Sequence, residues 1–173
     1  VMEFDYRRAA LLITKGESGR ALTILQPYVF RPQANVRMQS DYVDAHFRLG
    51  HYMQAVLAAD QFWNGKYESI PTYGLARLAD SLFKMQQYQR AQDIYEVVLK
   101  REPQNFFAGL SRAYCLAMSN RDEDALAGYV ACYKLRPDKE QLLIEEANAL
   151  LGKDKKHLAS AIYAYLQTES KNN

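Results

Sequence analysis

Small and apolar positions recur along the chain at a spacing close to that of a two-helix repeat. Alanines at one position of the pattern follow one another every 34 to 36 residues: Ala21, Ala55, Ala91, Ala125 and Ala161. Twelve residues before each of them stands another small or branched residue: Ala9, Val43, Ala79, Ala113 and Ala149. Small side chains at two fixed points let paired helices pack closely, and periods of about 20–50 residues are typical of solenoids. The pattern therefore predicts five helix pairs stacked in series.

Glycine and proline mark the turns of this pattern. Gly16 and Gly50 fall between the helices of the first two pairs, as glycine commonly does past a helix C-terminus. Pro103 and Pro137 end the third and fourth pairs, because proline does not continue a helix. The segment NGKYESIPTYG, residues 64–74, interrupts the pattern and supplies the additional residues of the second repeat. We expect one domain over 1–173, with repeats at about 2–35, 36–70, 71–105, 106–140 and 141–173.

The chain resembles the tetratricopeptide-repeat family over nearly its whole length. The matching residues are the paired small positions, the two closing prolines and a set of aromatic residues: Tyr52, Tyr88, Tyr95, Tyr129 and Tyr165. The usual tryptophan of the first helix is absent, and Gln33 and Tyr67 stand where a closing proline is usual. The resemblance implies an all-α fold, a right-handed α-solenoid of about five antiparallel helix pairs whose first helices line a concave groove.

The resemblance also implies which residues would face a partner. Mapped onto this chain, the groove positions hold aromatic rings beside acidic and basic side chains: Arg37, Asp44, Phe47, Arg48, Tyr73, Asp80, Phe83, Lys84, Phe107 and Tyr114. Such a surface suits an extended peptide, a loop of a partner protein or a polar polymer. The alternative is that several of the aromatic residues pack between repeats. The basic set that holds a C-terminal carboxylate in chaperone-binding members is missing here.

Candidate chemistry elsewhere in the chain is sparse. His46, His51 and His157 lie in different helices or turns and lack the spacing of a metal site, so we expect no metal. The acidic run at 122–124 stands at a predicted helix N-terminus, where carboxylates favour the helix dipole. It lacks the alternating ligands and the glycine of a calcium loop. With no phosphate loop and no nucleophile motif, we expect no catalytic residue and no cofactor.

Charge and hydropathy argue against two classes of segment, one that binds nucleic acid and one that spans a membrane as a helix. The 22 Lys and Arg residues and 20 Asp and Glu residues give a net charge of +2, with no basic block. This distribution argues against nucleic acid, which requires clustered basic side chains. No apolar run approaches the roughly 18 residues of a membrane-spanning helix. The chain begins VMEFDYRR and ends TESKNN, and we expect it to be a segment of a longer protein.

The order of segments carries a narrower resemblance. A KG-containing first turn, a divergent second repeat and a long irregular turn precede TYGLARLADSLFKMQQYQRAQDIYEVVLKREPQN, and AYCLAMSNRDEDAL follows. This order is similar to that of the N-terminal periplasmic repeats of outer-membrane exopolysaccharide exporters of the poly-N-acetylglucosamine type. The resemblance implies a non-catalytic scaffold on the periplasmic side of the bacterial outer membrane that holds a periplasmic polysaccharide deacetylase and guides polymer.

Two alternative functions stay open at this point. One is a cytoplasmic adaptor for the assembly of a protein complex, which would bind a protein or peptide and be indifferent to glycans. The other is a module that binds polysaccharide directly through four aromatic side chains of the predicted groove: Tyr73, Phe83, Phe107 and Tyr114.

Overall fold

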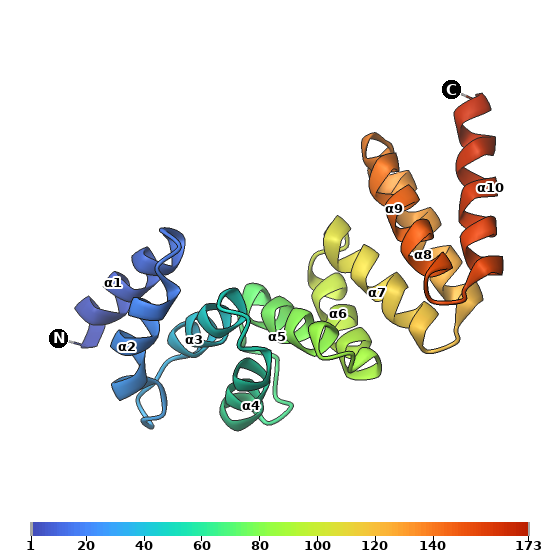
Figure 1. Cartoon of the computed structure of the whole chain (residues 1–173). Helices are drawn as coiled ribbons and strands as arrows, with labels where there is room; N and C mark the ends of the chain where they lie inside the picture. The colour runs from blue at the N-terminus through green and yellow to red at the C-terminus, as the bar shows by residue number, and fades with distance from the viewer. Residues whose placement is uncertain (1, 173) are drawn as a thin grey trace. The chain divides into compact units, whose positions relative to one another are not determined.

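The computed structural model describes residues 2–172, and over these residues every regular element is a helix. Ten α-helices and one short 3-10 helix follow one another, joined by short connections, and consecutive helices pack in antiparallel pairs (Figure 1). The predicted all-α class is confirmed. The chain divides into two compact units, Val1–Ile94 and Tyr95–Asn173.

The first unit is organised around one central helix, α3, which packs against α1, α2, α4 and α5. Of the irregular segment predicted at 64–74, residues 64–71 form the loop between α4 and α5, and residues 72–74 begin α5. The first two residues of the loop both have positive φ. The helices are α1 (Met2–Thr14), α2 (Ser18–Val29), α3 (Val36–Arg48), α4 (Tyr52–Trp63) and α5 (Thr72–Lys84). The boundary between the units falls within α6 (Tyr88–Arg101).

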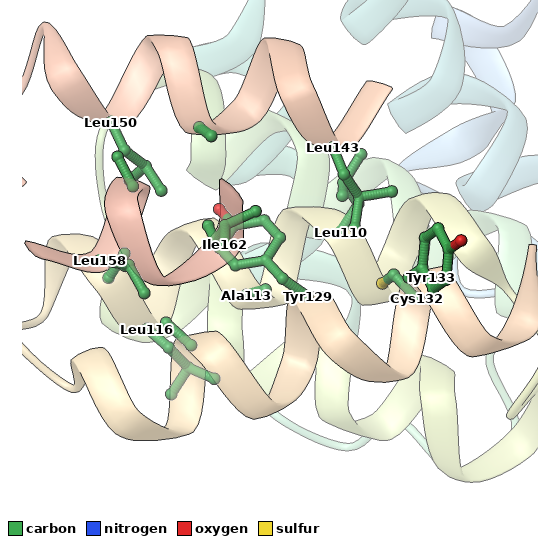
Figure 2. Close-up of a cluster of buried hydrophobic side chains, with 14 of the residues drawn as sticks. Leu110, Ala113, Leu116, Tyr129, Cys132, Tyr133, Leu143, Leu150, Leu158 and Ile162 are labelled. Carbon is green, nitrogen blue, oxygen red and sulfur yellow. The ribbon is translucent and has the colours of Figure 1, made fainter. Parts of the chain in front are cut away.

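The second unit contains two further helix pairs around one apolar core. The elements are α7 (Phe106–Met118), α8 (Asp122–Leu135), the 3-10 helix (Pro137–Lys139), α9 (Glu140–Leu151) and α10 (Lys156–Asn172). Figure 2 shows the core, in which Tyr129 lies among leucines and an isoleucine from α7, α9 and α10. The acidic run begins α8, as predicted from its composition.

The predicted small residues occupy the helix contacts in the first four pairs, where all eight are at most 1% exposed. In the fifth pair the prediction is wrong, because Ala149 is exposed and Ala161 is half-buried. Ala147 and Ala159 take these positions and are fully buried. They stand 34 residues after Ala113 and Ala125, so the spacing of the preceding repeat continues. A shift of two residues rotates a side chain by about 200° around a helix, which is why the choice of alanine matters.

The turn inside each helix pair has the same backbone geometry. A residue two or three positions past the end of the first helix has positive φ, at Gly16, Gly50, Gln86, Asn120 and Asp154. The next residue donates its backbone N–H to a carbonyl five residues earlier, over 2.8–3.0 Å: Glu17 to Leu12, His51 to His46, Gln87 to Leu82, Arg121 to Leu116 and Lys155 to Leu150. These two features define a Schellman motif, which brings together the side chains of the donor and acceptor residues.

Gly74 on α5 lies directly against Ser40 on α3. A β-carbon built at Gly74 would come within 2.8 Å of the Ser40 β-carbon and closer still to the Ser40 hydroxyl oxygen. Ser40 is fully buried, and its hydroxyl donates a hydrogen bond to the Val36 carbonyl at 2.7 Å. The absence of a side chain at Gly74 therefore permits the close approach of α3 and α5.

We expect Gly74→Ala to lower the free energy of unfolding by about 1–2 kcal/mol net. Overpacking costs about 1–3 kcal/mol, and the close contact with the fully buried Ser40 places the cost here in the upper half of that range. The better helix propensity of alanine returns about 1 kcal/mol of it. Urea denaturation followed by circular dichroism measures the change. Adding Ser40→Gly should recover part of the loss, because the new methyl group then occupies the space left by Ser40. A Gly74→Ala protein as stable as the parent would contradict this packing.

Candidate interaction surface

Eight of the ten predicted groove residues lie on two helices that pack against each other in the first unit, α3 and α5. On α3 they are Arg37, Asp44, Phe47 and Arg48, and on α5 they are Tyr73, Asp80, Phe83 and Lys84. Their spacings of three and four residues place them on one side of each helix. We call the surface formed by these side chains and Arg77 the α3–α5 face.

An ion network around a buried carboxylate joins the two helices. Asp44 on α3 is 6% exposed, and its two oxygens accept hydrogen bonds from Arg48 Nε at 3.0 Å and from Arg77 Nε at 2.6 Å. Arg77 also donates to Asp80 Oδ2 at 3.1 Å. Because Asp44 is buried and accepts hydrogen bonds from two guanidinium groups, it fixes the positions of these two cations on the face.

A second polar link lies one helical turn away. The Tyr73 hydroxyl donates to Asp41 Oδ1 at 2.7 Å and lies 3.2 Å from the Arg37 carbonyl oxygen. Burial raises the pKa of the Asp41 carboxyl, while the hydrogen bond from Tyr73 opposes that shift. Burial and the bond to Asp41 raise the pKa of the Tyr73 hydroxyl, so it stays a donor at neutral pH. Tyr73 keeps 40% of its surface exposed while its hydroxyl is fixed.

Two phenylalanines of the face pack within their own helix pairs. The Phe47 ring lies 5.7 Å from the Tyr52 ring, and the Phe83 ring lies 5.7 Å from the Tyr88 ring. The guanidinium carbon of Arg77 stands 4.8 Å from the centre of the Phe47 ring, at the distance of a cation–π contact. Both phenylalanines are half-buried, so each contributes to packing and to the surface.

The two remaining predicted groove residues belong to the second unit, on α7. Phe107 is 61% exposed, and the Lys139 ammonium lies 5.6 Å from the centre of its ring. Tyr114 is half-buried against the core of that unit. Phe107 is therefore accessible to a partner, whereas Tyr114 contributes mainly to packing.

Sequence reasoning missed two features of these surfaces. One is Arg77, which bonds to Asp44 and Asp80 and which the groove mapping omitted. The other is an open crevice of about 350 Å³ in the second unit, between α7 and α8, whose apolar lining includes Leu99, Phe106 and Leu135. The available signal was a glycine in each of these helices: Gly109 and Gly128 both line the crevice.

Several kinds of site find no support in the part of the chain that the structure describes. None of its helices combines the length and the apolarity that a bilayer span requires. Over the same residues, no group of three or more His, Cys, Asp and Glu side chains gathers as a metal site would. Cys115 and Cys132 are free and buried, and burial raises the pKa of the Cys115 thiol to about 12 and that of the Cys132 thiol to about 11. Thiols with such pKa values are poor nucleophiles at neutral pH.

Antiparallel helix pairs, buried small residues at fixed points and one repeated turn together define a tetratricopeptide-like, all-helical solenoid fold. Solved structures with this fold include MamA 41-end from Desulfovibrio magneticus RS-1, with a TM-score of 0.77 and 16% identity over 99% of this chain and 96% of that chain. They also include MamA AMB-1, with a TM-score of 0.78 and 13% identity over 96% of this chain and 97% of that chain. MamA MSR-1 aligns with a TM-score of 0.76 and 13% identity over 98% of both chains.

These similarities establish the fold, and at such identities they establish nothing further. No protein-family model matches the chain, and no curated protein matches it.

Proposed function

We propose that the chain is a non-catalytic protein-interaction scaffold whose α3–α5 face binds an extended segment of a partner protein. The observation that carries the proposal is the fixed arrangement of cationic and aromatic groups on that face, with Arg77 held by Asp44, Asp80 and the Phe47 ring. Groups that are already ordered lose little side-chain entropy on binding. Aromatic and arginine side chains are also those that most often dominate binding energy at interfaces.

The charge of the face favours an acidic partner segment. Arg37 and Lys84 are exposed, and no ion pair within the described part of the chain engages either of them. Cationic side chains at the edge of an interface attract a partner of opposite charge and raise its rate of association. The scaffold would act by raising the local concentration of that partner near its site of action.

Site-specific photo-cross-linking in the native cell tests this proposal. A photoreactive amino acid is placed at Arg37 and, separately, at Lys84, with matched placements at Lys153 and Lys156 in the second unit. These control lysines are also exposed. We expect a discrete cross-linked protein from the α3–α5 positions that is absent from the control positions. Equal products from both sets, or none from the face, would contradict the proposal.

Charge reversal then measures the contribution of the two free cations. Arg37→Glu with Lys84→Glu should weaken capture of the cross-linked partner by about tenfold, equivalent to about 1.4 kcal/mol. Lys153→Glu with Lys156→Glu should leave capture unchanged. Because all four side chains are exposed, we expect the four substitutions to preserve the fold.

We further propose, on the sequence resemblance alone, that the scaffold works on the periplasmic side of a bacterial outer membrane in exopolysaccharide export. Its partner there would be a periplasmic polysaccharide deacetylase. Cell fractionation with an antibody against this chain tests the setting: a product in the outer-membrane fraction supports it. A product confined to the cytoplasm would overturn it and support a cytoplasmic assembly adaptor.

Direct binding of polysaccharide is the second candidate, favoured by the exposed rings of Tyr73 and Phe107. Aromatic rings stack on sugar faces while a hydroxyl adds hydrogen bonds. Oligosaccharide binding that is lost on replacement of both residues by alanine would support this function, and unchanged binding would overturn it.

A further inference from the structure

The turn between α3 and α4 departs from the other four turns in its side chains. In four helix pairs the residue whose carbonyl accepts the closing hydrogen bond is a leucine that is at most 7% exposed: Leu12, Leu82, Leu116 and Leu150. In the second pair that position holds His46, and the residue that closes the turn is His51. A histidine in place of an internal leucine puts polar nitrogen atoms where packing is otherwise apolar, which is unfavourable without a polar partner.

The Schellman motif brings the two imidazoles together, although the sequence spacing alone did not indicate it. His46 Nδ1 and His51 Nδ1 are 3.4 Å apart. This separation is longer than the usual 2.7–3.2 Å of a hydrogen bond from an N–H donor. Two nitrogen ligands about 2.0–2.1 Å from one tetrahedral metal ion lie about 3.3–3.4 Å apart. The observed separation therefore matches the edge of a tetrahedral coordination sphere.

The surroundings fix one ligand and leave the other accessible. The ring centroid of Tyr42 lies 4.7 Å from that of His46 in an edge-to-face arrangement, and Phe30 and Phe62 pack against Tyr42. His46 is half-buried while His51 is exposed, so an ion can reach the pair from solvent.

We propose that His46 and His51 form a binding site for a divalent transition metal ion such as Zn²⁺, held through the two Nδ1 atoms. Imidazole ligands suit Zn²⁺, Cu²⁺ and Ni²⁺, whereas Mg²⁺ and Ca²⁺ require oxygen ligands. No third His, Cys, Asp or Glu side chain joins the pair within the described residues. The remaining coordination positions are filled by water, as in an open site.

Calorimetric titration of the tag-free chain with Zn²⁺ in a non-chelating buffer tests the proposal. We expect saturable binding of one ion per chain. Loss of even an outer-shell partner of a metal ligand lowers affinity about 10–100-fold, so loss of a ligand should lower it at least about tenfold. His46→Leu is the sharpest variant, because leucine is the residue that the other four turns carry. It should keep the fold, measured by circular dichroism, while losing the ion.

His51→Gln provides an independent variant at an exposed position, where the fold is at little risk. His157→Gln is the matched control, since His157 is exposed and stands on α10, far along the chain from the pair. The proposal predicts that each change at the pair weakens binding at least about tenfold and that the control retains the affinity of the parent chain. It is overturned if the parent chain binds no Zn²⁺, if both pair variants bind it as the parent does, or if binding depends on His157.

Discussion

Replacement of Tyr129 by alanine should lower the free energy of unfolding of the second unit by about 3–5 kcal/mol, the cost of removing a buried aromatic side chain. Tyr129 is completely buried in the core shown in Figure 2, in the same apolar cluster as Leu116, Leu143 and Ile162. Close-packed side chains collapse only partly around such a cavity. The loss is large beside the total stability of about 5–15 kcal/mol that is typical of a domain.

Tyr129→Phe separates packing from hydrogen bonding at the same position. The Tyr129 hydroxyl donates to Glu146 Oε2 at 3.2 Å, and burial raises the pKa of the Glu146 carboxyl. Phenylalanine keeps the ring and removes the donor, so we expect a smaller loss of about 1 kcal/mol.

Hydrogen exchange locates the effect of the Tyr129 substitutions as well as its size. In repeat proteins each pair contacts only its neighbours, so amide protection should decrease mainly in α7, α8, α9 and α10, the helices that share this core. A Tyr129→Ala protein that loses less than about 1 kcal/mol, or that loses protection equally at α1 and α2, would contradict the assignment of this core.

The helix pairs could be predicted from the sequence because their signals are local. Small residues at a fixed period and glycine past a helix end depend on neighbours within a few residues, and Gly16 and Gly50 have the positive φ expected of them. The register of the fifth pair could not be fixed in this way. Several alanines stand near the required position, and only packing between helices selects Ala147 and Ala159.

The candidate sites were less predictable because their contacts are not local. Arg77 contacts Asp44 across two helices that are more than thirty residues apart in sequence, and no single helix pattern indicates that pair. The histidine pair had a local signal in the sequence, but the ligand spacings expected along a single helix do not include it, because the two histidines lie on either side of a turn. Gly50 stands two residues past the end of α3, with His46 four residues before it and His51 directly after it. In a Schellman motif these are the acceptor and donor positions, so this spacing predicts contact between the two rings.

The second large effect should come from removing both cations that hold the buried carboxylate of Asp44. Arg48→Met with Arg77→Met keeps most of the aliphatic packing and leaves Asp44, which is 6% exposed, without a cationic partner. Removing one partner of a buried ion pair lowers the free energy of unfolding by about 3–5 kcal/mol, because the other charge stays buried without a partner. Both arginines are partly exposed, so we expect a loss near the lower end of that range. Urea denaturation measures it.

Comparison of the single and double variants distinguishes the stabilising effect of the ion network from the small effect of removing exposed surface charges. Each single substitution should cost less than half of the double, because Asp44 keeps one guanidinium in either case. Adding Asp44→Asn to the double variant should recover part of the loss, since a neutral amide is less costly to bury than a carboxylate. Strict additivity, or a double loss under about 1 kcal/mol, would contradict the network. If the network is confirmed, substitutions at Arg48 or Arg77 weaken partner binding by disturbing the structure of the α3–α5 face. Substitutions at the exposed Arg37 and Lys84 then measure the contribution of those two charges to binding.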